Sequence, residues 1–199
     1  MSTGLLIVLI VIVVVAVVVG GVALRKRAPG PHGGRNLKRR FGPEYERVVA
    51  RHDGDAKAAE HELGERVERH GDLRERPLES AERERFAARW TAAQEHFVES
   101  PQQAVADADL LLAELAGARG FPDGGQYEEQ LAALSVHHAD HVDGYRRVHR
   151  AAHENRADTE EMRSALIEAR ALFDDLVGEG ERPRPKSHSR LNKLQLKGS

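Results

Sequence analysis

Histidine is the residue type through which this chain could do chemistry. The chain has 11 histidines in 199 residues, and five of them fall between residues 137 and 153. His149 and His153 are four residues apart, so both rings can point the same way from one helix, as metal ligands do. His141 lies on roughly the same face two turns earlier and is the third candidate ligand. A metal site is usually completed by a carboxylate, and the nearby ones are Asp140, Asp143 and Glu154.

Other interpretations of these histidines stay open. Histidine titrates near neutral pH, so the same side chains could form a pH-responsive element. They could also pack in the core or lie in solvent without a function. The stretch HELGE at 61–65 lacks the second histidine of the zinc-protease motif.

Signatures of catalysis and cofactor binding are absent from the sequence. It has no nucleophile elbow, no phosphate loop and no dinucleotide fingerprint. It also has no cysteine, which excludes disulfides, thiolate metal sites and a cysteine nucleophile. We therefore assign no catalytic residue and no cofactor, although an enzyme of unrecognised class stays open.

Charge divides the chain into three parts. Residues 43–180 hold 17 Lys and Arg against 31 Asp and Glu, a net charge of −14, whereas the segments 25–42 and 181–199 are basic. An acidic body is repelled by phosphate backbones, which argues against a nucleic-acid partner. Basic flanks suit an anionic lipid surface instead. The candidate membrane-surface residues are Arg25, Lys26, Arg27, Lys38, Arg39 and Arg40.

Residues 5–24 read LLIVLIVIVVVAVVVGGVAL and contain no charged side chain. About 20 helical residues cover about 30 Å, the thickness of a bilayer's hydrocarbon core. The segment predicts a single membrane span, and the basic residues after it place the following domain in the cytoplasm, with the N-terminus outside. Ala16 and Gly20 form a small-residue pair through which two spans could dimerise. Cleavage of the span or the opposite orientation would make the body extracellular.

The rest of the chain reads as helical. β-branched residues are scarce after residue 25, and no stretch alternates apolar and polar side chains as a strand does. The fold class is therefore all-α, with one N-terminal transmembrane helix, a Gly/Pro-containing basic linker and a single bundle of about six or seven helices. We divide the chain into an N-terminal tail (1–4), the transmembrane helix (5–24), the linker (25–42), the acidic helical domain (43–180) and a basic disordered tail (181–199).

Turn and capping residues predict where the helices begin and end. Prolines at first helical positions open two helices, Asp55 and Ser80 are good N-caps, and 53–54 is a break. The side chains expected at the centre of the core are Phe86, Trp90, Ala93 and Phe97, and Val98 is expected to be buried beside them. The expected helices cover 43–52, 56–70, 80–99, 101–120, 126–136, 139–155 and about 159–178.

Several stretches resemble those of one bacterial protein family. They are RFGPEYERVV (40–49), RPLESAERERFAARW (76–90), FVESPQQAVADADLL (97–111) and LSVHHADHVDGYRRVH (134–149). Similar stretches occur in short membrane proteins of high-GC Gram-positive bacteria with one span, a basic linker and a helical domain. The resemblance implies this topology and an all-α fold. Because no activity is assigned to that family, it implies no catalytic residue.

The leading functional hypothesis is a membrane-anchored helical adaptor that binds a protein partner at the inner face of the cell membrane. The alternative is a metal- or pH-responsive helical sensor built on His141, His149 and His153.

Overall fold

Within the residues that the computed structural model describes, 33–154 and 157–178, all regular structure is helical. This confirms the all-α class, with eight α-helices in that part of the chain where six or seven were expected. The helices are α2 (Gly34–Phe41), α3 (Pro43–Arg51), α4 (Ala56–His70), α5 (Ser80–His96), α6 (Pro101–Ala118), α7 (Tyr127–His137), α8 (Val142–His153) and α9 (Thr159–Gly178), with a 3-10 turn at Gly124–Gln126.

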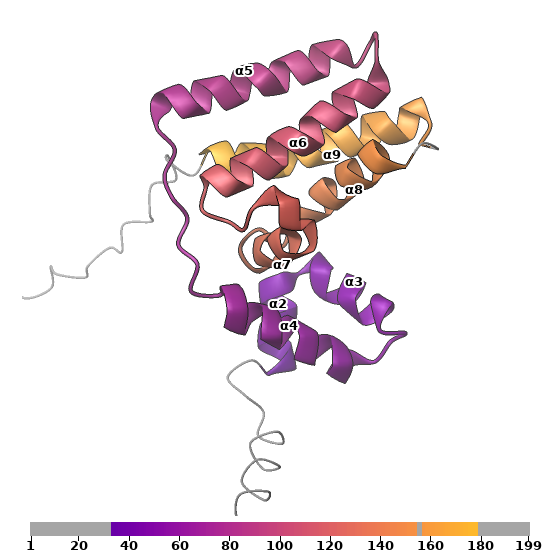
Figure 1. Ribbon diagram of the computed structural model, residues 1–199. Helices are drawn as coiled ribbons and strands as arrows, with labels where there is room; N and C mark the ends of the chain where they lie inside the picture. Colours follow the sequence, from indigo (N-terminus) through magenta and orange to yellow (C-terminus); the bar gives the residue numbers. More distant parts are fainter. Residues whose placement is uncertain (1–32, 155–156, 179–199) are drawn as a thin grey trace, which may run out of the picture.

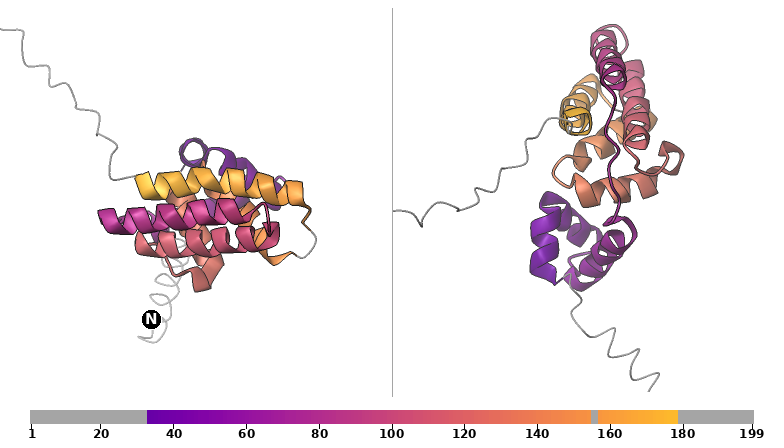
Figure 2. Two further views of the ribbon diagram at one scale, coloured as in Figure 1. Left: turned by 90° about the horizontal axis from the view of Figure 1, so that it is seen from above. Right: turned by 90° about the vertical axis from the view of Figure 1, so that its left-hand side faces the viewer.

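The helices form two groups, each with its own hydrophobic core (Figures 1 and 2). The larger core lies among α5, α6, α8 and α9, where Trp90 stacks on Phe173 with ring centroids 4.6 Å apart. The smaller core joins α2, α3 and α4, and it is completed by Val136 and Ala139 at the end of α7. Helix α7 therefore connects the two groups.

Helix α2 lies where the sequence predicted a linker. Leu37 and Phe41 are one helical turn apart and are 2 % and 0 % exposed, so they belong to the smaller core. The prediction was wrong here because Gly and Pro content was given more weight than this apolar spacing. Burying two large side chains outweighs the low helix propensity of the glycine that begins α2. The folded domain thus begins at α2 and not at residue 43.

Several predicted helix ends are confirmed. The side chain of Asp55 accepts hydrogen bonds from the backbone N–H groups of Lys57 and Ala58 at the start of α4. Helix α5 begins differently from the prediction, because Glu79 is its N-cap in place of Ser80. Glu79 and Glu82 form a reciprocal capping box, which satisfies two N–H groups at once.

Helices α8 and α9 approach closely at Gly144. A Cβ atom at this position would lie 2.4 Å from the backbone oxygen of Glu168 in α9. Glycine therefore permits the close packing of the two helices, and this packing fixes the helix that carries His149 and His153.

No helix among the described residues is both long and apolar enough to cross a membrane. The expected span lies outside the described residues, and so do the expected disordered tail and five of the candidate side chains: Ala16, Gly20, Arg25, Lys26 and Arg27.

Candidate functional site

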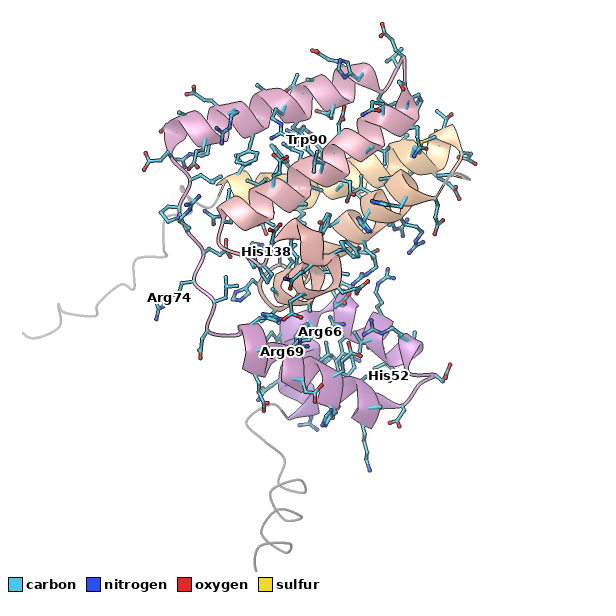
Figure 3. All side chains as sticks on the ribbon, in the orientation of Figure 1. His52, Arg66, Arg69, Arg74, Trp90 and His138 are labelled. Carbon is cyan, nitrogen blue, oxygen red and sulfur yellow. The ribbon has the colours of Figure 1, made fainter. Side chains whose placement is uncertain are left out.

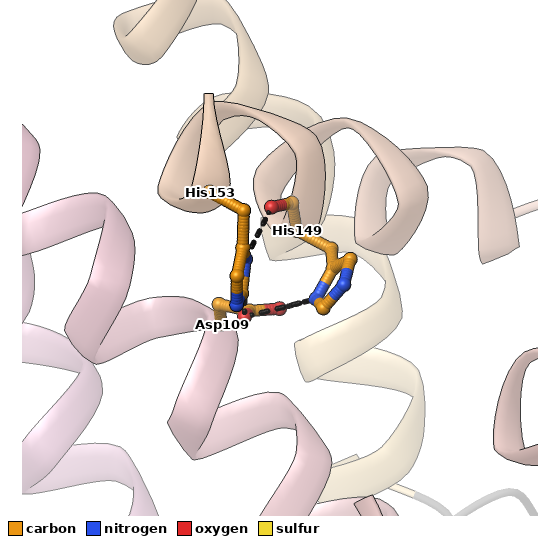
Figure 4. A group of neighbouring side chains, drawn as sticks. All are labelled: Asp109, His149 and His153. Carbon is orange, nitrogen blue, oxygen red and sulfur yellow. Dashed lines mark hydrogen bonds and ion pairs between the residues drawn. The ribbon is translucent and has the colours of Figure 1, made fainter. Parts of the chain in front are cut away.

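His149 and His153 lie one turn apart near the C-terminal end of α8, as the sequence predicted. Both rings lie against the carboxylate of Asp109, which comes from the middle of α6 (Figure 4). His149 Nδ1 is 3.0 Å from each carboxylate oxygen, and His153 Nδ1 is 3.7 Å from Oδ2. Among the described residues, these three are the one group of histidine and acidic side chains in which three potential metal-ligand atoms lie within 4.8 Å of one another.

The two rings are held in place by their neighbours. Tyr127 stacks on His149 with centroids 3.6 Å apart and planes 10° from parallel. His153 Nδ1–H donates to the backbone oxygen of His149 at 2.8 Å, which leaves its Nε2 with a lone pair. The side chain of Gln102 in α6 donates to the backbone oxygens of residues 151 and 152, so it ties the end of α8 to α6.

Asp109 is unusual because it is a carboxylate on the buried face of an apolar helix. It is 8 % exposed, and Ala108 and Leu112 beside it are fully buried. Burial raises the pKa of Asp109, and the opposing effect of His149 and His153 does not cancel that rise. Burial therefore disfavours the charged carboxylate, and a positive charge beside it offsets part of that cost.

The group of Asp109, His149 and His153 opens into a surface groove. This groove has a volume of about 820 Å³ and runs between α6 and α8 as far as the loop around Gly124. Its wall on α6 carries small side chains, with Ala106 and Ala113 one above the other and Gly117 beyond them. The site is thus accessible from solvent along one side.

His141 and the carboxylates expected beside it do not join this group. His141 precedes α8 as its N-cap residue, and eight residues of helix rotate it by about 80° from His149. Asp143 pairs with Arg47 and Arg146. Asp109 was missed because it is 40 residues from His149 in the sequence. Its position on the apolar face of an expected helix could have indicated a carboxylate with a special role.

A second polar cluster is centred on His138, which is buried between two carboxylates. Its Nδ1 is 2.9 Å from Asp175 in α9, and its Nε2 is 3.0 Å from Glu75 in the connector before α5. Burial alone would lower the pKa of His138, but the hydrogen bonds and charges of Glu75 and Asp175 outweigh burial and raise it. The charged ring thus connects three segments that are distant in sequence.

A third polar cluster lies between the two groups of helices, where Figure 3 shows Arg66 beneath α7. Arg66 donates to the buried Glu44 at 3.1 Å and to Ser135 of α7 at 2.9 Å. Arg146 of α8 donates to the same carboxylate oxygen of Glu44 at 2.9 Å. Burial would raise the pKa of Glu62, but hydrogen bonds from His52, Arg66 and Arg51 lower it to about 2. This cluster fastens α3 and α4 to the bundle.

The candidate membrane-surface residues that the structure describes are Lys38, Arg39 and Arg40, and all three are exposed on α2. Lys38 pairs with Glu46 at 2.6 Å, and Arg40 Nε lies 3.5 Å from the backbone oxygen of Val136. The three side chains therefore lie on one helix whose opposite face is buried.

No family model matches this chain, and neither curated proteins nor solved structures provide a significant match.

Proposed function

We propose that this protein is a membrane-anchored helical interaction domain. Residues 5–24 span the cell membrane with the N-terminus outside, and α2 rests on the anionic lipid surface of the cytoplasmic face. The remaining helices present a groove to a protein partner. The observation that carries the proposal is the attachment of α2 to the folded domain, directly after a basic segment and an uncharged apolar one.

The attachment of α2 supports a fixed orientation at the membrane. Leu37 and Phe41 bind the helix to the smaller core, so Lys38, Arg39 and Arg40 are held on the surface of the domain. Nine residues separate the end of the apolar segment from α2. A chain of nine residues reaches at most about 30 Å, so α2 stays close to the lipid headgroups.

The charge layout favours the same orientation. Each basic residue near an anionic surface contributes about 1 kcal/mol of attraction, whereas the acidic body is repelled. The two groups of helices are stacked, with α2 in the smaller group (Figure 2). We therefore infer that α2, α3 and α4 face the membrane and that the bundle of α5, α6, α8 and α9 faces the cytoplasm.

The groove between α6 and α8 has the shape and charge of a protein-binding surface. Ala113 and Gly117 leave room beside α6, and the groove is lined by Glu114 and Asp123 but by no Lys or Arg side chain. Leu110 is 57 % exposed at its rim, which supplies an apolar contact. The occupant that fits this chemistry is a basic, partly apolar segment of a partner protein.

The proposal is tested with the full chain in membranes. We expect it to resist alkaline extraction, and we expect external protease to leave the body intact in whole cells. A photoreactive residue in place of Asn36, exposed on α2, should crosslink to anionic lipid, whereas one in place of Ala88, exposed on α5, should not. Extraction at alkaline pH would refute the membrane anchor, and cleavage from outside would refute the orientation. Equal lipid crosslinking at the two positions would refute the placement of α2 on the lipid surface.

Two further measurements use the same chain. Charge reversal at Arg39 and Arg40 should lower the lipid crosslinking at position 36 without releasing the chain from the membrane. A photoreactive residue in place of Leu110 should crosslink to a protein that the Ala88 position does not reach. Unchanged lipid crosslinking in the charge-reversed chain would show that α2 does not lie on the lipid surface.

A further inference from the structure

The side chains of Asp109, His149 and His153 have the chemistry of ligands for a transition metal. Two imidazoles and one carboxylate suit Zn²⁺ and its neighbours in the first transition row, whereas Ca²⁺ and Mg²⁺ prefer sites made of oxygen atoms. The three residues come from two helices that are packed in the larger core. The site is therefore built on rigid elements and not on a loop.

The distances between the ligand atoms fit one metal ion. Bonds of 2.0–2.1 Å to a tetrahedral Zn²⁺ place neighbouring ligand atoms about 3.3 Å apart. The Asp109 carboxylate is 3.0 Å from His149 Nδ1, close to that value, and a ring nitrogen of His153 lies within 4.8 Å of both ligand atoms. Figure 4 shows both rings converging on the carboxylate. An ion would take the place of the proton that His149 shares with Asp109.

The contacts around the ligands are those that usually support a metal site. A histidine ligand commonly donates its other ring N–H to a carbonyl or carboxylate, and His153 donates to the backbone oxygen of His149 in this way. The stacked ring of Tyr127 fixes the plane of His149. The bonds from Gln102 to α8 fix the spacing between the helices that carry Asp109 and His153.

We propose that Asp109, His149 and His153 form a binding site for a divalent transition-metal ion, with Zn²⁺ as its natural probe. Three protein ligands leave one coordination position open, and this position faces the groove between α6 and α8. The site differs from the set expected from the sequence, because Asp109 replaces His141. It is independent of the membrane proposal, since it needs only the bundle.

The test is Zn²⁺ binding to the untagged full chain in detergent micelles, measured by competition with a chromogenic chelator. We expect a dissociation constant in the micromolar range or below. The Co²⁺ form should show the intense visible bands of a four-coordinate ion. Asp109→Asn and His153→Ala should each weaken Zn²⁺ binding by more than about 10-fold. His153 has an exposed side chain, so its removal leaves the packing of α8 intact.

Two histidine variants serve as matched controls. His96 also lies beside a carboxylate, with Nδ1 4.0 Å from Asp107, but it belongs to no converging group of three among the described residues. His96→Ala and His141→Ala should therefore leave Zn²⁺ affinity unchanged. Emission from Trp90 checks that each variant is folded. Absence of binding at micromolar Zn²⁺, or binding that survives His153→Ala, would overturn the proposal.

Discussion

Replacing Gly144 with alanine tests the close approach of α8 and α9. The added Cβ would lie 2.4 Å from the oxygen and 2.5 Å from the carbon of the Glu168 carbonyl. Ordinary contacts between such atoms are about 3.5 Å, so the helices must separate by about 1 Å. The obstacle is backbone and cannot rotate away, which distinguishes this position from one facing a flexible side chain.

The magnitude follows from two opposing effects. Overpacking a core costs about 1–3 kcal/mol, and a backbone obstacle places Gly144→Ala near the upper limit. Alanine in a helix gains at most about 1 kcal/mol over glycine. The net loss in the free energy of unfolding is therefore about 2 kcal/mol. For a folded part of this size, that lowers the melting temperature by about 4–8 °C.

Gly64 in α4 provides the matched control, because a Cβ there would meet no atom within 4 Å. Gly64→Ala should raise the free energy of unfolding by about 0.5–1 kcal/mol through helix propensity alone. Urea unfolding followed by the emission of Trp90, the single tryptophan, measures both variants. If Gly144→Ala is as stable as the unmodified chain, the packing argument for α8 and α9 is wrong.

Three further substitutions test the buried clusters. Because the pKa of His138 is raised in the folded protein, its contribution to the free energy of unfolding is complete below about pH 6.5 and is lost as the pH rises through the raised value. His138→Gln should therefore make the free energy of unfolding, measured with urea, depend less on pH. An unchanged pH dependence would contradict this. Arg66→Met should cost about 3 kcal/mol in calorimetry because it removes a donor from the buried Glu44, and a loss below about 1 kcal/mol would refute this. Phe41→Ala should cost about 3 kcal/mol if α2 belongs to the fold, and a neutral result would exclude that.

Much of the helical architecture could be predicted from the sequence. The expected 56–70 helix coincides with α4, and the break before it occurs where Asp53 and Gly54 both have positive φ. These features depend on local chemistry, namely capping side chains and apolar spacing within one helix. The expected aromatic side chains are also buried, including Trp90 at 1 % and Phe86 at 3 % exposure. The expectation for Val98 was wrong: it is 88 % exposed because α5 ends at His96, before this residue.

The candidate site could be predicted only in part. The four-residue spacing of His149 and His153 lies within one helix, so sequence reasoning placed both on one face. Asp109 lies 40 residues away in a different helix. Which carboxylate meets the two rings depends on how α6 packs against α8, and this is decided by the shared core.

The sequence by itself determined the helical class, the charge layout and the pairing of His149 with His153, because each follows from periodicity or counting along the chain. Only the tertiary structure decided that α2 belongs to the domain, that Asp109 completes the histidine pair and that His138 lies between two carboxylates. The physical reason is the same in all three cases. Each depends on faces of helices that meet across long stretches of chain, and their meeting is set by the total burial of apolar surface in the two cores.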